Sequence, residues 1–149
     1  MNETLHSWMP LWIPIIVVVV TQLIKIIIEI PQNGFQWRNM NSYGGMPSTH
    51  TALCVSMTTM IGLTAGWSSP LFALASVVSI ITIRDAVGIR WELGYHGQIL
   101  NHLIHLLPAE KRKTFPQHLI ERLGHTPLEA FAGGVVGAIL TIIIYALVN

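Results

Sequence analysis

Long apolar stretches separated by short polar ones dominate the chain. Three of them approach or exceed the roughly 20 apolar residues that a membrane-crossing helix needs: Met9 to Ile30, Pro70 to Ile83 (extending toward Ile89) and Pro127 to Val148. A fourth stretch, Thr51 to Trp67, is shorter and richer in Thr, Ser and Gly, which is typical of a helix packed against other helices. The pattern therefore predicts an all-α integral membrane bundle of about four transmembrane helices, forming one membrane-embedded domain over residues 1–149.

Two polar stretches separate these helices, Pro31 to Thr49 and Arg90 to Thr126. Within the second, Tyr95 to Leu107 places Gln98, Asn101, His102 and His105 opposite a row of Ile and Leu residues. This predicts an amphipathic helix that lies at the membrane interface or covers a site. His102 and His105 could suggest a metal, but their surroundings lack further ligands, so we expect neither a metal nor another cofactor.

Composition and charge narrow the class of protein. Hydrophobic residues make up 52% of the chain and charged residues 10%, compared with about 25% charged residues in an average soluble domain. A net charge of +1 gives no reason to expect a nucleic-acid partner. The single cysteine, Cys54, excludes an internal disulfide.

The distribution of basic residues predicts an orientation. With four spans, the two polar stretches share one side of the membrane, and the termini and the Ala65 to Ser69 turn share the other. The first side carries Arg38, Arg90, Lys111, Arg112, Lys113 and Arg122, whereas the second carries no Lys or Arg. The positive-inside rule then makes the basic side cytoplasmic.

Polar residues at membrane depth form the first candidate for chemistry. Gln22, Lys25 and Glu29 follow helical spacing and therefore lie on one stripe of the first span. Lys25 and Glu29 could simply neutralise each other at i, i+4. Alternatively, Lys25 is a cation directed at an anionic ligand.

A second candidate is Gly44-Gly45-Met46-Pro47-Ser48-Thr49-His50. The glycines allow a sharp turn, and Ser48 or Thr49 can cap the helix that follows. This would create a helix N-terminus suited to an anion, with His50 in its first turn. An ordinary helix start with an interfacial histidine explains the same residues.

A third candidate is Gly124-His125-Thr126-Pro127-Leu128-Glu129, at the start of the last span. Glu129 is placed to accept a hydrogen bond from the His125 imidazole, as in an activated histidine. Thr126 to Glu129 is also a capping box, and the two interpretations are compatible. Asp85 lies close to Arg84 and Arg90, either as a structural ion pair or as a group that orients Arg90.

Together these motifs resemble the type 2 phosphatidic acid phosphatase superfamily, whose active site is shared with vanadium-dependent haloperoxidases. The closest similarity is to its divergent bacterial and plastid branch. It is carried by the Gly44-to-His50 and Leu123-to-Glu129 segments, Asp85-Ala86-Val87-Gly88-Ile89-Arg90, and Gln98 with Asn101. The resemblance extends from about Lys25 to the C-terminus and implies a phosphatase-like domain in a multi-pass protein of a bacterial cell membrane.

Three positions depart from the superfamily pattern. Gln32 stands seven residues after Lys25, where the superfamily has Arg, and the nearest arginine is Arg38. Leu119 occupies the position of another Arg, which makes Arg90 the expected replacement. The acid is Glu129 instead of the usual Asp.

The resemblance implies a metal-independent mechanism. His125 would attack phosphorus and form a phosphohistidine, Glu129 would orient His125, and His50 would act as general acid and then base. Phosphate-binding residues would be Lys25, Arg38, Ser48 and Arg90, with Asp85, Gln98 and Asn101 in support. The implied partners are a lipid phosphate or diphosphate substrate and membrane lipids, while self-association into a homo-oligomer stays open. Two other classes compete: a catalytically inactive lipid-binding or scaffold protein of the same fold, and a small lipid transporter.

Overall fold

The computed structural model describes residues 7–33, 45–116, 118–121 and 123–149, and in this part of the chain all regular structure is helical. The long helices are α2 (Met9–Asn33), α3 (Thr49–Ala65), α4 (Pro70–Val87), α5 (Ile89–Leu106) and α7 (Pro127–Val148). A short helix, α6 (Ala109–Arg112), follows α5. The predicted all-α class is confirmed.

Local signals in the sequence set the helix boundaries. Ser48, Ser69 and Thr126 cap α3, α4 and α7, and each side chain accepts a hydrogen bond from a first-turn backbone N–H. Pro70 and Pro127 occupy the first turns of α4 and α7, where a missing N–H costs nothing. The sequence therefore places the last span correctly at Pro127–Val148, while α3 begins two residues before the predicted Thr51.

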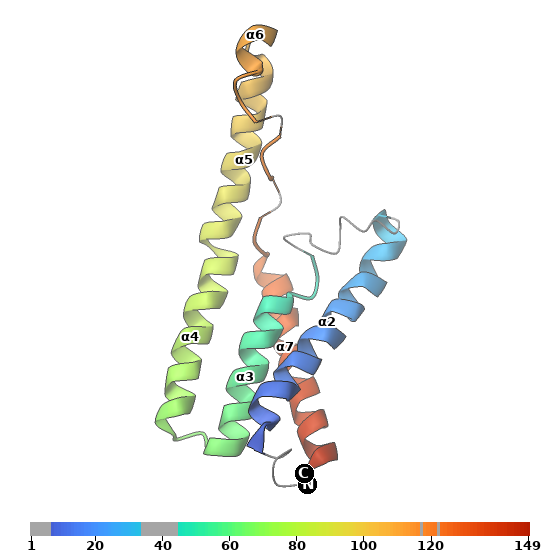
Figure 1. Cartoon of the computed structure of the whole chain (residues 1–149), viewed down its shortest axis with the longest axis vertical. Coiled ribbons are helices and arrows are strands. Elements are labelled where there is room, and N and C mark those ends of the chain that lie inside the picture. Colours follow the sequence, from blue (N-terminus) through green and yellow to red (C-terminus); the bar gives the residue numbers. More distant parts are fainter. Residues whose placement is uncertain (1–6, 34–44, 117, 122) are drawn as a thin grey trace.

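Four helices, α2, α3, α4 and α7, lie side by side, with α3 packed against the other three (Figure 1). Polar side chains join them inside the bundle: Thr141 of α7 donates to Ser56 of α3 at 2.6 Å, and Thr58 of α3 pairs with Ser79 of α4 at 2.8 Å. A Cβ added at Gly137 would lie 2.5 Å from the Ala52 carbonyl oxygen, so this glycine permits close packing of α7 on α3. The Thr-, Ser- and Gly-rich composition of α3 thus serves helix packing.

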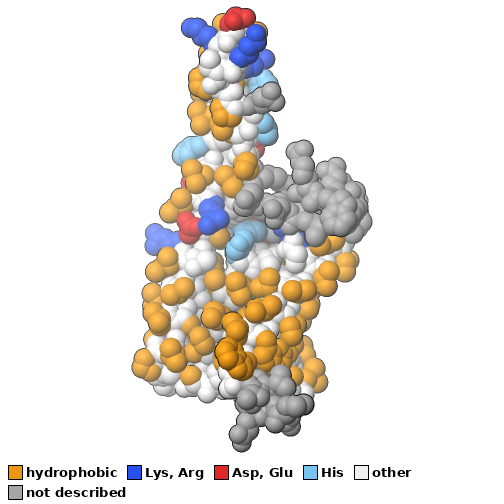
Figure 2. Space-filling view, in the orientation of Figure 1, with side chains coloured by type: hydrophobic (Ala, Val, Ile, Leu, Met, Phe, Trp, Pro, Cys, Tyr) orange, Lys and Arg blue, Asp and Glu red, His pale blue; other side chains and the backbone are white. Residues whose placement is uncertain are grey.

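The outer surface of the bundle is apolar. Hydrophobic side chains cover much of its lower part, and charged and histidine side chains lie above them (Figure 2). Among the described residues, three helical stretches are able to cross a membrane by length and composition: Met9–Ile28, Pro70–Leu106 and Pro127–Val148. The membrane class is therefore confirmed, while a fourth span at the shorter α3 stays a prediction.

The amphipathic helix differs from the sequence-based prediction. It begins at Ile89 instead of Tyr95, directly after Gly88, and α5 continues α4 upward beyond the other helices (Figure 1). Together α4 and α5 span 37 residues. At 1.5 Å per residue this is about 55 Å, longer than the ~30 Å hydrocarbon layer, so α5 extends past the bundle end.

The two ends of the bundle differ in what they carry. The start of α2, the α3–α4 turn and the end of α7 share one end (Figure 1). The starts of α3 and α7 and the junction of α4 with α5 lie at the other. This arrangement brings the two histidine motifs to the same end.

Candidate functional site

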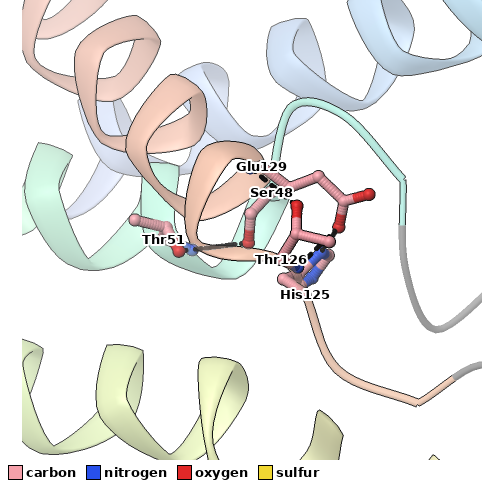
Figure 3. Close-up of polar contacts among 5 residues, drawn as sticks. All are labelled: Ser48, Thr51, His125, Thr126 and Glu129. Atoms are coloured by element: carbon pink, nitrogen blue, oxygen red, sulfur yellow. Dashed lines mark hydrogen bonds and ion pairs between the residues drawn. The ribbon is translucent and has the colours of Figure 1, made fainter.

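His50, in the first turn of α3, lies close to His125, which directly precedes Thr126, the cap of α7. Their ring centroids are 6.3 Å apart, with the rings tilted by 54°. A backbone hydrogen bond fixes the two motifs together, because the N–H of Ser48 donates to the Glu129 carbonyl at 3.0 Å (Figure 3). Gly133 allows this approach, since a Cβ there would collide with the Ser48 backbone.

The position of His125 depends on the glycine before it. Gly124 has a φ of +79°, and an added Cβ would lie 2.6 Å from the Ala86 carbonyl oxygen. That same carbonyl accepts a hydrogen bond of 3.0 Å from the His125 backbone N–H. The end of α4 therefore holds His125 in place, a contact that the sequence did not reveal.

His125 and Glu129 form the predicted pair. Nδ1 of His125 lies 3.2 Å from Oε2 of Glu129, and the side chains are 8% and 21% exposed. The same Oε2 accepts from the Thr126 N–H at 3.1 Å, and Thr126 Oγ1 accepts from the Glu129 N–H at 3.2 Å (Figure 3). The carboxylate thus caps α7 and orients the imidazole at the same time, as the sequence allowed.

Burial lowers the pKa of His125 below its ordinary value of 6.5. The hydrogen bond and the charge of Glu129 oppose this shift, whereas the positive charges of Lys25 and His50 reinforce it. Lys25, His50 and Glu129 therefore all lie within electrostatic reach of His125.

Lys25 reaches this region on the predicted polar stripe of α2. It is 5% exposed, and one turn earlier Gln22 accepts a hydrogen bond of 2.9 Å from the Thr49 hydroxyl. This bond docks the stripe on the N-terminus of α3, next to His50. The side chain of Glu29 lies outside the described residues.

Ser48 is fully buried and acts as the cap of α3. Its Oγ accepts from the Thr51 N–H at 3.4 Å and the Thr51 hydroxyl at 3.1 Å. The Ser48 hydroxyl oxygen thus accepts two hydrogen bonds, which fix the first turn of α3.

Asp85 and Arg90 form an ion pair of 2.8 Å at the junction of α4 and α5. Their side chains are 39% and 50% exposed, so this pair lies at the surface beside the Gly124 turn, whose Cβ position is 3.0 Å from the Arg90 carbonyl carbon. Arg38, the other predicted phosphate-binding arginine, lies outside the described residues.

Asn101 and Gln98 lie on α5, above the bundle. Asn101 is buried and exchanges two hydrogen bonds of 2.9 Å with the backbone of Leu119, and it donates to Glu121 at 2.7 Å. Gly94 and Gly97 leave room for the same returning segment. Asn101 therefore fastens the chain that leads to His125. The side chain of Gln98 is exposed and has no hydrogen bond to any described residue.

Within the described ranges, no three His, Cys, Asp or Glu side chains gather as metal ligands would. His102 and His105 are exposed on α5.

An all-α membrane bundle in which buried His125 pairs with half-buried Glu129 beside a second histidine defines the class: a helical membrane protein with a cluster of ionisable side chains at one end. The chain belongs to the Divergent PAP2 family, which matches residues 7–140. It is similar to the Uncharacterized membrane protein YuiD of Bacillus subtilis (strain 168), with 32% identity over 146 residues, covering 91% of this chain and 92% of the relative. No solved structure matches the chain significantly.

Proposed function

We propose that this protein is a membrane phosphatase that hydrolyses a lipid phosphate or diphosphate through a phosphohistidine on His125. The observation that carries the proposal is the 3.2 Å contact between His125 Nδ1 and Glu129 Oε2. A carboxylate acceptor holds the imidazole proton on Nδ1, which leaves the lone pair of Nε2 available for attack. The lowered pKa of His125 favours the same neutral imidazole. An oriented, uncharged histidine is what nucleophilic catalysis requires.

His50 is suited to move the proton. In the first step, Nε2 of His125 bonds to phosphorus, and the leaving oxygen departs with its bonding electrons and takes a proton from His50. In the second step, His50 removes a proton from water, whose oxygen attacks phosphorus and breaks the P–N bond. The 6.3 Å separation of the two ring centroids leaves a phosphoryl group within reach of both.

Positive groups around the pair would neutralise the phosphate. Lys25 is buried close enough to influence His125, and Arg90 lies at the adjacent helix junction with Asp85 orienting it. The first-turn N–H groups of Thr49 and His50 have no hydrogen-bond partner among the described residues, and Ser48 caps the helix that presents them. Arg38 completes the proposed set as a prediction from the sequence.

A lipid substrate follows from where the site lies. His50 and His125 lie where α3 and α7 begin, at one end of the apolar bundle, which is where the headgroup layer begins if the bundle fills the hydrocarbon layer. Phosphatidate, phosphatidylglycerophosphate and a polyprenyl diphosphate carry suitable groups. The excess of Lys and Arg at this end supports our proposal that it faces the cytoplasm of a bacterial cell.

The test is phosphate release by the purified protein across a panel of lipid phosphates. His125→Ala should abolish release, whereas His96→Ala, which removes an exposed histidine of α5, should leave it unchanged. Circular dichroism and gel filtration check folding, since His125 is buried. Orthovanadate, a mimic of pentacoordinate phosphorus, should inhibit, and EDTA should not.

If a folded His125→Ala protein still released phosphate, His125 would not be the nucleophile. Absence of release by the wild type on every substrate, with retained lipid-phosphate binding, would favour the inactive lipid-binding protein. Translocation of lipid in vesicles without release would favour a transporter.

A further inference from the structure

An apolar groove of about 680 Å³ lies between α3, α4 and α7. Aliphatic and aromatic side chains line most of it, and Arg84 is its one charged lining residue. Its volume falls within the roughly 300–1,000 Å³ of sites that bind small molecules. The groove lies on the membrane-embedded part of the bundle, so an apolar occupant is required.

One end of the groove borders the histidine site. Thr51, which follows His50, and Pro127, which follows Thr126, both line it. Arg84 lies in the last turn of α4, close to the Ala86 carbonyl that holds His125. From Pro127 the lining continues along α7 to Ala138, a distance of about 16 Å at 1.5 Å per residue.

We infer that this groove holds a hydrocarbon chain of the lipid phosphate whose headgroup reaches His125. The inference rests on the proposed function and adds where the lipid chain lies. The continuity of groove and site and the position of Arg84, a cation beside the end where an anionic headgroup would be, together select this occupant over an uncharged bulk lipid.

The glycines of α7 show which positions can block the groove. An added Cβ at Gly133 or Gly137 meets the backbone of α3, so these two serve helix packing. At Gly134 it meets only the side-chain methyl carbons of Val55 at 3.5 Å and Thr51 at 3.7 Å, both ordinary contacts. A larger side chain at Gly134 therefore enters the groove without meeting the backbone of α3, and Ala138, which also lines the groove, offers a second position.

The experiment uses phosphatidate with a photoreactive diazirine at the end of one acyl chain, in phosphatidylcholine vesicles containing the full chain. Labelled residues are located by mass spectrometry. We expect labelling of groove residues that excess unlabelled phosphatidate competes away. Gly134→Leu and Ala138→Phe should each weaken labelling about tenfold, because every displaced methylene weakens binding roughly fourfold.

Ala146→Phe is the matched control, since it adds the same ring to an exposed position of α7 outside the groove. Its labelling should equal that of the wild type. Equal labelling by phosphatidylcholine carrying the same diazirine would show bulk lipid in the groove and overturn the inference. So would labelling that both groove variants leave unchanged, or cross-links joining two copies of the chain there.

The labelling does not depend on catalysis, so the two proposals fail separately. Specific labelling without phosphate release would contradict the phosphatase proposal and support the groove as a lipid-binding site. Phosphate release with unspecific labelling would contradict the groove as a lipid-binding site and support the phosphatase proposal.

Discussion

The backbone N–H of Ser48 donates a hydrogen bond of 3.0 Å to the carbonyl of Glu129. This single bond joins the cap of α3 to the first turn of α7, so His50 and His125 are held by one rigid junction. The proposed mechanism, which places an acid and a nucleophile around one phosphoryl group, needs such a fixed frame.

Glu129 has two roles that substitution can separate. Glu129→Gln keeps an oxygen that can cap α7 but loses the charge that stabilises the His125 imidazolium, so hydrolysis should fall by up to ~10⁴, as for the carboxylate of a Ser-His-Asp triad. Thr126→Ala should instead cost about 0.5–2 kcal/mol of stability and leave hydrolysis nearly intact. Phosphate release measures the first effect and thermal unfolding the second. Equal loss of phosphate release in both variants would show that Glu129 serves only to cap α7.

The pH dependence of hydrolysis should show the lowered pKa of His125. Protonated Nε2 cannot attack, so activity should disappear as pH falls through a value below 6.5. Since Glu129 raises the pKa of His125 against the effect of burial, Glu129→Gln should move this acid limb to still lower pH. The measurement is the pH profile of kcat/KM, and a limb above 6.5, or one that moves upward in the variant, would contradict the assignment.

Gly124 should tolerate no side chain, and Gly66 provides the comparison. Both have positive φ, which costs a residue with a Cβ about 1–3 kcal/mol. A Cβ at Gly66 meets no heavy atom within 4 Å, whereas at Gly124 it would push against Ala86 and Trp91. We expect Gly66→Ala to lower thermal stability but keep hydrolysis, and Gly124→Ala to lose hydrolysis. Equal activity in the two variants would show that the Gly124 turn does not position His125.

Asn101 should hold in place the segment around Leu119, which returns from α5 toward the bundle. Asn101→Ala leaves the Leu119 N–H and carbonyl without their partner, at a cost of about 1–3 kcal/mol. Hydrogen exchange at Leu119 should therefore become faster. The bundle amides, for example that of Thr141, serve as the internal control and should not change. An unchanged exchange rate at Leu119 would show that Asn101 does not hold this segment in place.

The membrane orientation is testable with single cysteines in a Cys54→Ser background. Ser68 lies in the α3–α4 turn and Lys113 just after α6, and both are exposed. With the basic end in the cytoplasm, an impermeant thiol reagent on intact cells should label a cysteine at Ser68 and not one at Lys113. Labelling after the cells are opened controls for reactivity at Lys113, and the reverse pattern would place the histidine site outside.

The sequence by itself determined the helices and the His125–Glu129 pair. Apolar runs, Ser and Thr caps and first-turn prolines act over a few residues, and the pair lies within one helical turn, so local rules suffice. The resemblance to the phosphatase superfamily rested on short motifs and agrees with the family found for the chain.

Only the tertiary structure decided how these pieces combine. The approach of His50 to His125, the Ala86 contact, the role of Asn101 and the groove along Gly134 all depend on packing between segments far apart in the chain. The direction of α5 likewise escaped the sequence, because an amphipathic pattern specifies which face is apolar and leaves open what that face packs against. Such contacts follow from the close fit of whole helices, which no local pattern of residues encodes.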